Sequence, residues 1–118
     1  MTRKRPKQFG PDHTFAKGDI RSKNKLFQPD KYARVQEALT KLRPVADRKG
    51  VTMGQLALAW VTSHPDTCAI AGARNANQAS ENAKAASIAL SNEELSEIDE
   101  IGCGVTGHLD ENPVMWNL

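Results

Sequence analysis

The sequence has 118 residues, of which 39% are hydrophobic and 25% are charged, as expected of one domain with a modest core. It has no run of the roughly 20 apolar residues that a membrane helix needs, and no apolar run follows the basic N-terminus, so neither a membrane span nor a signal peptide is expected. Its two cysteines, Cys68 and Cys103, match no metal-ligand or redox spacing, so we expect reduced thiols and a cytoplasmic protein.

The charges are distributed unevenly along the chain. Residues 1–49 hold 14 Lys and Arg against 5 Asp and Glu, whereas residues 50–118 hold 2 against 9. This asymmetry has two interpretations, which the sequence leaves open: two parts of one fold that attract each other, or a basic tail on an acidic domain.

Residues 1–28 show no periodicity and are interrupted by proline and glycine, so we expect a basic tail and a long loop. The opening MTRKRPK carries four positive charges in seven residues and is suited to contact phosphates. A solvated tail is the simpler explanation, so a nucleic-acid partner is not the favoured interpretation.

A long helix is predicted to follow, in the region 29–118 that we assign to the main fold. Apolar residues recur there at spacings of three and four, Asp30 is placed to cap the start, and Gly50 is placed to end the helix. Pro44 lacks an amide donor and crowds the preceding turn. The pattern therefore predicts either a kink at Pro44 or two helices joined near Arg43.

The next segment predicts a buried helix and a buried strand. Thr52 and Gln55 have the spacing of a capping box, and the LALAW stretch that follows is apolar on nearly every face, which is typical of a helix buried between layers. The short apolar run Thr67–Ala71 predicts one buried strand. The chain offers it no second strand, so its backbone groups require partners from elsewhere.

Two further helices are predicted near the C-terminus. Asn75 is a good N-cap for the first helix, and Ser91 with Glu94 forms a capping box for the second. The glycines at 102–107 are expected to stop the last helix. The order of helix, buried helix, strand, helix and helix favours part of an α/β architecture over an independent bundle.

The segment 70–82 has the features of an anion site. A glycine turn leads into a helix start, where free N–H groups and the helix dipole favour a bound anion, and Arg74 adds a planar pair of donors suited to phosphate. Gln78 and Asn82 share one helix face with Asn75. The alternative interpretation is structural: a capping pair, a surface arginine and a solvated helix face.

Residues 50–101 resemble the C-terminal region of aldo-keto reductases. The family pattern there is a QLALAW helix, a short strand, an (I)PGxRxxxQxxEN segment and a final helix after an L-S/T-x-E-E start, and this chain has QLALAW, AIAGARNANQASEN and LSNEE. Ala71 departs from the family's frequent proline. GPDHTFAKGDIRS is more loosely similar to the long loop before the family's seventh helix, and DENPVMWN to the end of some bacterial members.

This resemblance implies a C-terminal fragment of a (β/α)8 TIM barrel, mostly helical with one short strand, in a family that carries out NADP-dependent hydride transfer between carbonyls and alcohols. It implies that the cofactor is NADP and that its 2′-phosphate end is bound by Gly72, Ala73, Arg74, Gln78, Glu81 and Asn82. The family's catalytic Asp, Tyr, Lys and His lie on earlier strands and find no match here, so no catalytic or metal residue is assigned and the expected partner is the missing N-terminal barrel portion. The alternative is a small helical binding module whose basic arm contacts nucleic acid.

Overall fold

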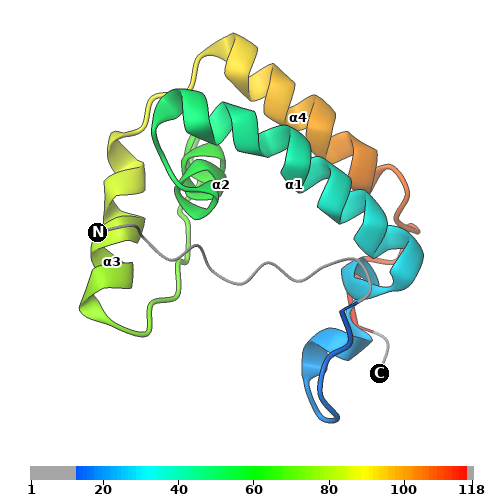
Figure 1. Ribbon diagram of the computed structural model, residues 1–118. Helices are drawn as coiled ribbons and strands as arrows, with labels where there is room; N and C mark the ends of the chain where they lie inside the picture. Colours follow the sequence, from blue (N-terminus) through cyan, green and yellow to red (C-terminus); the bar gives the residue numbers. More distant parts are fainter. Residues whose placement is uncertain (1–12, 117–118) are drawn as a thin grey trace.

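The computed structural model describes residues 13–116, and this part of the chain is mostly helical (Figure 1). Its four α-helices are α1 (Pro29–Lys49), α2 (Met53–Thr62), α3 (Ala76–Lys84) and α4 (Asn92–Thr106). Three short 3₁₀ helices accompany them: η1 (Ile20–Lys23), η2 (Lys25–Phe27) and η3 (Ala85–Ser87). No helix among the described residues is both long enough and apolar enough to cross a membrane.

Helix α1 runs through Pro44 without a break, which excludes the predicted alternative of two helices. Pro44 lies on the exposed side of α1, as does Thr40, whose carbonyl loses its amide partner to the proline ring. Water can satisfy that carbonyl, so the helix continues. Gly50 ends α1 in the left-handed conformation with φ 68°, as predicted, but the N-cap is Gln28 rather than Asp30.

Helices α1 and α4 lie side by side and antiparallel, with the end of α1 beside the start of α4 (Figure 1). The buried core lies where these two helices meet α2, and it is made of Val45, Ala46, Leu56 and Ile98. Two ion pairs flank this contact: Arg48–Glu97 at 2.7 Å and Lys49–Glu94 at 3.1 Å. The uneven charge along the sequence thus includes attraction between two parts of one fold, although each partly exposed pair contributes little free energy by itself.

Both predicted capping boxes are present. In α2 the Thr52 hydroxyl accepts from the Gln55 amide and the Gln55 side chain accepts from the Thr52 amide. Ser91 and Glu94 make the same exchange in α4. The Ser91 amide and then the Lys49 ammonium hold the pKa of Glu94 below its usual value. Helix α4 continues past Gly102 and Gly104 to Thr106 and has Gly107 as its C-cap, so only the last of the glycines predicted at 102–107 ends it.

Helix α2 is only partly buried, contrary to the prediction from its LALAW stretch. Leu56 and Ala59 are buried, whereas Ala57 is exposed and Trp60 is half-buried. The stretch has apolar residues on nearly every face, but the described part of the chain covers one face alone. An apolar surface therefore remains open.

The predicted buried strand Thr67–Ala71 does not form in the described part of the chain. These residues are irregular and mostly exposed, and the Ile70 side chain is fully exposed. A strand requires a neighbour for its backbone N–H and C=O groups, and no described residue pairs with this segment. The expectation of one short strand is therefore corrected to an extended segment that pairs with nothing within residues 13–116.

The loop before α1 is joined to the C-terminal tail. The Lys25 side chain is buried and its Nζ donates to Asp110 Oδ1 at 2.7 Å and to the Asn112 carbonyl at 3.2 Å. The Lys25 amide donates to the Met115 carbonyl, and Asn24 forms an isolated bridge with Trp116. These contacts order the part of the predicted long loop that the structure describes. The basic stretch MTRKRPK lies outside the described residues.

Candidate phosphate-binding segment and apolar groove

The segment that leads into α3 is built by side chains that cap the helix start. Asn75 has an extended backbone, and its Oδ1 accepts from the Gln78 amide at 2.9 Å, as the sequence predicts for an N-cap. The Gln78 Oε1 in turn accepts from the Arg74 amide at 2.8 Å. Gln78 thus has an internal structural role, which is part of the alternative interpretation of this face.

A second hydrogen bond ties the glycine turn to the middle of α3. The Asn82 Nδ2 donates to the Gly72 carbonyl at 3.0 Å, across ten residues of sequence. Together with the bond from the Arg74 amide to Gln78, it holds the turn Gly72–Arg74 against the helix. The structure therefore brings four of the predicted residues, Gly72, Arg74, Gln78 and Asn82, into one hydrogen-bonded unit.

The Arg74 side chain projects from this unit without an internal partner. Arg74 is exposed, and no ion pair or hydrogen bond involves its guanidinium among the residues that the structure describes. Its backbone position is fixed by Gln78 while its charged group is open to solvent. A guanidinium held in this way can bind an oxyanion with two parallel hydrogen bonds.

Gly72 is not required by the chain's own packing. A Cβ atom built on it meets no atom within 4 Å, and its φ is outside the left-handed region. An alanine would thus fit the described structure equally well. A glycine there leaves extra space at the exposed surface beside Arg74, as the close approach of a ligand to the backbone needs.

The other predicted residues lie on either side of this unit. Ala73 is exposed in the turn, and Glu81 is half-buried on the side of α3 that faces α2. The Glu81 carbonyl accepts from Gln55 Nε2 at 3.0 Å. Sequence reasoning assigned Gln55 to the α2 capping box alone and missed this contact, because no spacing rule connects residues 26 positions apart.

The first turn of α3 completes the chemistry of the segment. A helix start leaves N–H groups without intrahelical acceptors, and Asn75 takes only the one at Gln78. The remaining N–H groups, the positive end of the helix dipole and the Arg74 guanidinium all favour negative charge. The arrangement is suited to a phosphate or a carboxylate at the surface.

The tyrosine and the histidine at the end of α2 make their contacts with other parts of the chain. Tyr32 is buried, with its ring 5.3 Å from that of Phe27. His64 lies at the end of α2, its Nδ1 2.8 Å from the Trp60 carbonyl and its ring packed edge-on against the indole. No group of three potential metal ligands occurs within residues 13–116. Both thiols are free and exposed.

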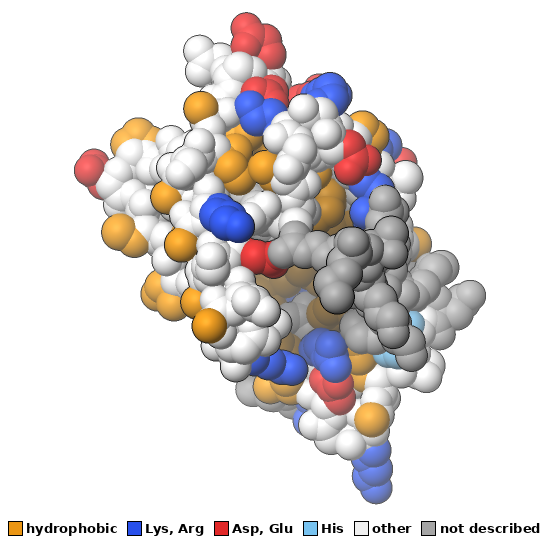
Figure 2. Space-filling view, turned by 60° about the vertical axis from the view of Figure 1, so that its left-hand side comes forward, with side chains coloured by type: hydrophobic (Ala, Val, Ile, Leu, Met, Phe, Trp, Pro, Cys, Tyr) orange, Lys and Arg blue, Asp and Glu red, His pale blue; other side chains and the backbone are white. Residues whose placement is uncertain are grey.

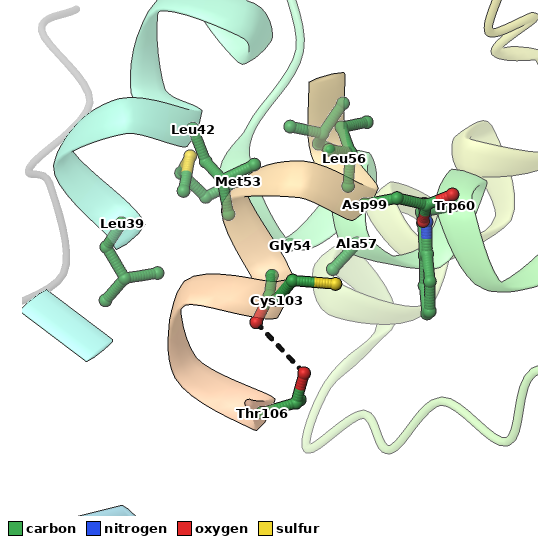
Figure 3. Close-up of a pocket in the computed structure, with 12 residues that line it drawn as sticks. Leu39, Leu42, Met53, Gly54, Leu56, Ala57, Trp60, Asp99, Cys103 and Thr106 are labelled. Carbon is green, nitrogen blue, oxygen red and sulfur yellow. Dashed lines mark hydrogen bonds between the residues drawn. The ribbon is translucent and has the colours of Figure 1, made fainter. Parts of the chain in front are cut away.

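A separate apolar groove opens between α1, α2 and α4 (Figure 3). Its volume is about 770 Å³, and Leu39, Leu42, Met53, Ala57 and Cys103 line it together with the Trp60 ring. The Trp60 Nε1 donates to Asp99 Oδ1 at 2.8 Å at one edge. Hydrophobic side chains are also exposed at several places on the face that Figure 2 shows. The apolar stretch of α2 indicated such a surface, but its place depended on the packing of three helices.

Comparison with known proteins supports the sequence resemblance. Residues 2–102 match the model of the aldo/keto reductase family. The aldo-keto reductase yakc [NADP(+)] of Schizosaccharomyces pombe is 32% identical over 73% of this chain and 26% of its own length, and the aldo-keto reductase str7 of Strobilurus tenacellus is 26% identical over 80% of this chain and 28% of its own. An uncharacterised oxidoreductase of Mycobacterium tuberculosis is 38% identical over 63% of this chain and 23% of its own length. The chain therefore spans about a quarter of the relatives that it matches.

Proposed function

Because the chain belongs to the aldo-keto reductase family, we propose that its Gly72–Asn82 segment binds the adenosine 2′-phosphate end of NADP. The observation that carries the proposal is the Arg74 guanidinium, which is fixed at its backbone, lacks an internal partner in the described residues and lies beside a helix start. The name of one relative includes NADP(+), which supports the same cofactor here.

The residues of the segment fit a phosphorylated ribose. Arg74 supplies the charge and two parallel donors, and the backbone at Gly72 is open to close approach. Gln78 and Asn82 hold the turn in the shape that presents these donors. Ala73 lies within the turn, and Glu81 lies three residues beyond Gln78 in α3; the proposal assigns both residues to the same end of the cofactor on the family resemblance.

The bound cofactor would supply the hydride for reduction of a carbonyl compound. In this proposal the chain contributes cofactor affinity and discrimination for the 2′-phosphate. By the family resemblance the catalytic groups belong to the N-terminal part of the barrel, and the chain aligns with only about a quarter of the relatives' length. We therefore propose an oxidoreductase role that needs that part.

Two exposed apolar surfaces support the proposal that further elements complete a barrel with this chain. The groove between α1, α2 and α4 and the exposed Ile70 segment are both open within residues 13–116. The relatives extend over about four times the aligned length. We propose that strands of the remaining portion pair with Thr67–Ala71 and that its apolar side chains cover the groove.

The direct test compares two nucleotides that differ in the 2′-phosphate. The ¹⁵N-labelled chain is titrated with adenosine 2′,5′-bisphosphate and with adenosine 5′-monophosphate, and backbone amide shifts are followed by NMR. We expect the bisphosphate to shift the amides of Gly72, Arg74 and Asn75 at lower concentration. Equal responses to both nucleotides, or shifts confined to other parts of the chain, would contradict the proposal.

A further inference from the structure

Gln55 joins the start of α2 to α3 through the two ends of its side-chain amide. Its Oε1 accepts from the Thr52 amide at 3.1 Å and completes the capping box, while its Nε2 donates to the Glu81 carbonyl at 3.0 Å. The residue is half-buried. Its rotamer is therefore fixed from both sides, which an isolated capping box does not require.

The Glu81 carbonyl lies where α3 passes into the 3₁₀ helix η3. In a regular α-helix the amide four residues later, at Ala85, would donate to it. Here α3 tightens into the 3₁₀ helix η3, and the Ala85 amide instead donates to the carbonyls of Asn82 and Ala83. The Gln55 amide donates to this part-buried carbonyl from another helix, and the bond ties the end of α3 to the start of α2.

The contact lies one residue from the side chain that holds the glycine turn. Asn82 donates to the Gly72 carbonyl, and Gln78, one turn earlier in α3, accepts from the Arg74 amide. The turn itself has little other support, since residues 70–80 are all exposed. Its position relative to the buried core is thus set through α3, and α3 is attached to α2 by Gln55 and by the buried Ala85.

We propose that Gln55 is a positioning residue for the phosphate-binding segment: it fixes the distance and orientation of the Gly72–Arg74 turn relative to α2 through the Glu81 carbonyl. The identity of the ligand rests on the proposed NADP function, whereas the effect of Gln55 on the position of the turn can be tested without any ligand.

Two variants separate this connection from the capping box. Gln55→Glu keeps the oxygen that accepts from the Thr52 amide, because glutamate serves equally in a capping box, but it loses the donor to Glu81. Thr52→Ala is the matched control, since it removes the hydroxyl half of the box and leaves the Gln55 amide in place. Both are made in the full 118-residue chain.

The first readout is amide hydrogen exchange by mass spectrometry, without ligand. We expect Gln55→Glu to speed exchange over residues 72–85 by about threefold to tenfold, the effect of one neutral hydrogen bond. Thr52→Ala should speed exchange mainly at the start of α2. If the two variants have the same effect on residues 72–85, or if Gln55→Glu has none, the inference is overturned.

The second readout is affinity for adenosine 2′,5′-bisphosphate, measured at low and high ionic strength. We expect Gln55→Glu to weaken binding about threefold to tenfold at both, because a lost hydrogen bond persists in salt whereas repulsion by the new carboxylate is screened. If Gln55→Glu speeds exchange over residues 72–85 but leaves the affinity unchanged, Gln55 has only a structural role and the positioning claim is overturned. If exchange responds as expected but the wild-type chain binds nucleotides with and without the 2′-phosphate equally, the connection from Gln55 to the Gly72–Arg74 turn stands and the proposed NADP function fails.

Discussion

Replacing Arg74 with alanine is the most informative single change in the proposed site. The guanidinium makes no internal ion pair or hydrogen bond within the described residues, and the amide that Gln78 accepts from belongs to the backbone. Arg74→Ala should therefore leave the turn and α3 folded. A hydrogen bond to a charged group contributes about 1.5–3 kcal/mol, so the loss of affinity for NADPH should be about one to two powers of ten.

The comparison with NADH makes this result specific. NADH lacks the 2′-phosphate, so Arg74→Ala should weaken its binding far less. Arg74→Lys should recover part of the NADPH affinity, because the ammonium keeps the charge and loses the planar pair of donors. Calorimetric titration of both cofactors measures these affinities for the wild type and the two variants, in this chain and in the chain joined to the N-terminal portion of a relative. Equal losses for NADPH and NADH would show that Arg74 is structural, and the phosphate assignment of Gly72–Asn82 would fall with it.

Four other outcomes are expected. The purified chain alone should not oxidise NADPH in the presence of aldehydes; turnover that persists through repurification would refute this. Lys25 holds the pKa of Asp110 below its usual value in the folded chain. This ion pair therefore stabilises the fold at neutral pH, and the stabilisation is lost as the pH falls below the unfolded-state pKa of about 3.9 and through the lower folded-state pKa. Asp110→Asn should accordingly lower the unfolding midpoint at pH 7, and the difference should shrink in acid. A hydrophobic dye should bind the groove. The variant Ala57→Lys, which places a charge in the groove, should bind less dye, whereas the control Ala83→Lys on the exposed face of α3 should bind as much as the wild type. Deleting residues 2–8 should remove only weak, salt-sensitive affinity for nucleic acid, whereas a tight, sequence-dependent complex would favour the binding-module alternative.

Local signals in the sequence were sufficient for the helix ends. The Thr52 and Ser91 capping boxes and the Asn75 cap are confirmed, because each depends on a side chain three residues from the backbone group that it satisfies. The left-handed Gly50 is confirmed as well, because glycine lacks the Cβ that disfavours positive φ. The family resemblance was also contained in a contiguous stretch. The match over residues 2–102 confirms it.

Predictions that depended on distant surroundings were less successful. The Thr67–Ala71 run has the composition of a buried strand, but strand formation requires a neighbouring backbone, and none is present in the described residues. Helix α2 was expected to be buried on all sides because its composition is apolar, but it is only partly buried. Burial depends on what packs against a helix, which its own composition does not determine. The tolerance of Pro44 likewise depended on which side of α1 faces water.

The composition of the Gly72–Asn82 segment was determined by the sequence, whereas its attachment to the rest of the chain was decided by the tertiary structure. Residue types and spacing indicated a donor-rich turn at a helix start. The Asn82 bond to the Gly72 carbonyl and the Gln55 bond to the Glu81 carbonyl span 10 and 26 residues. The first bond requires the glycine turn to fold back on α3, and the second requires α2 to pack beside α3, which places the Gln55 amide within reach of the Glu81 carbonyl.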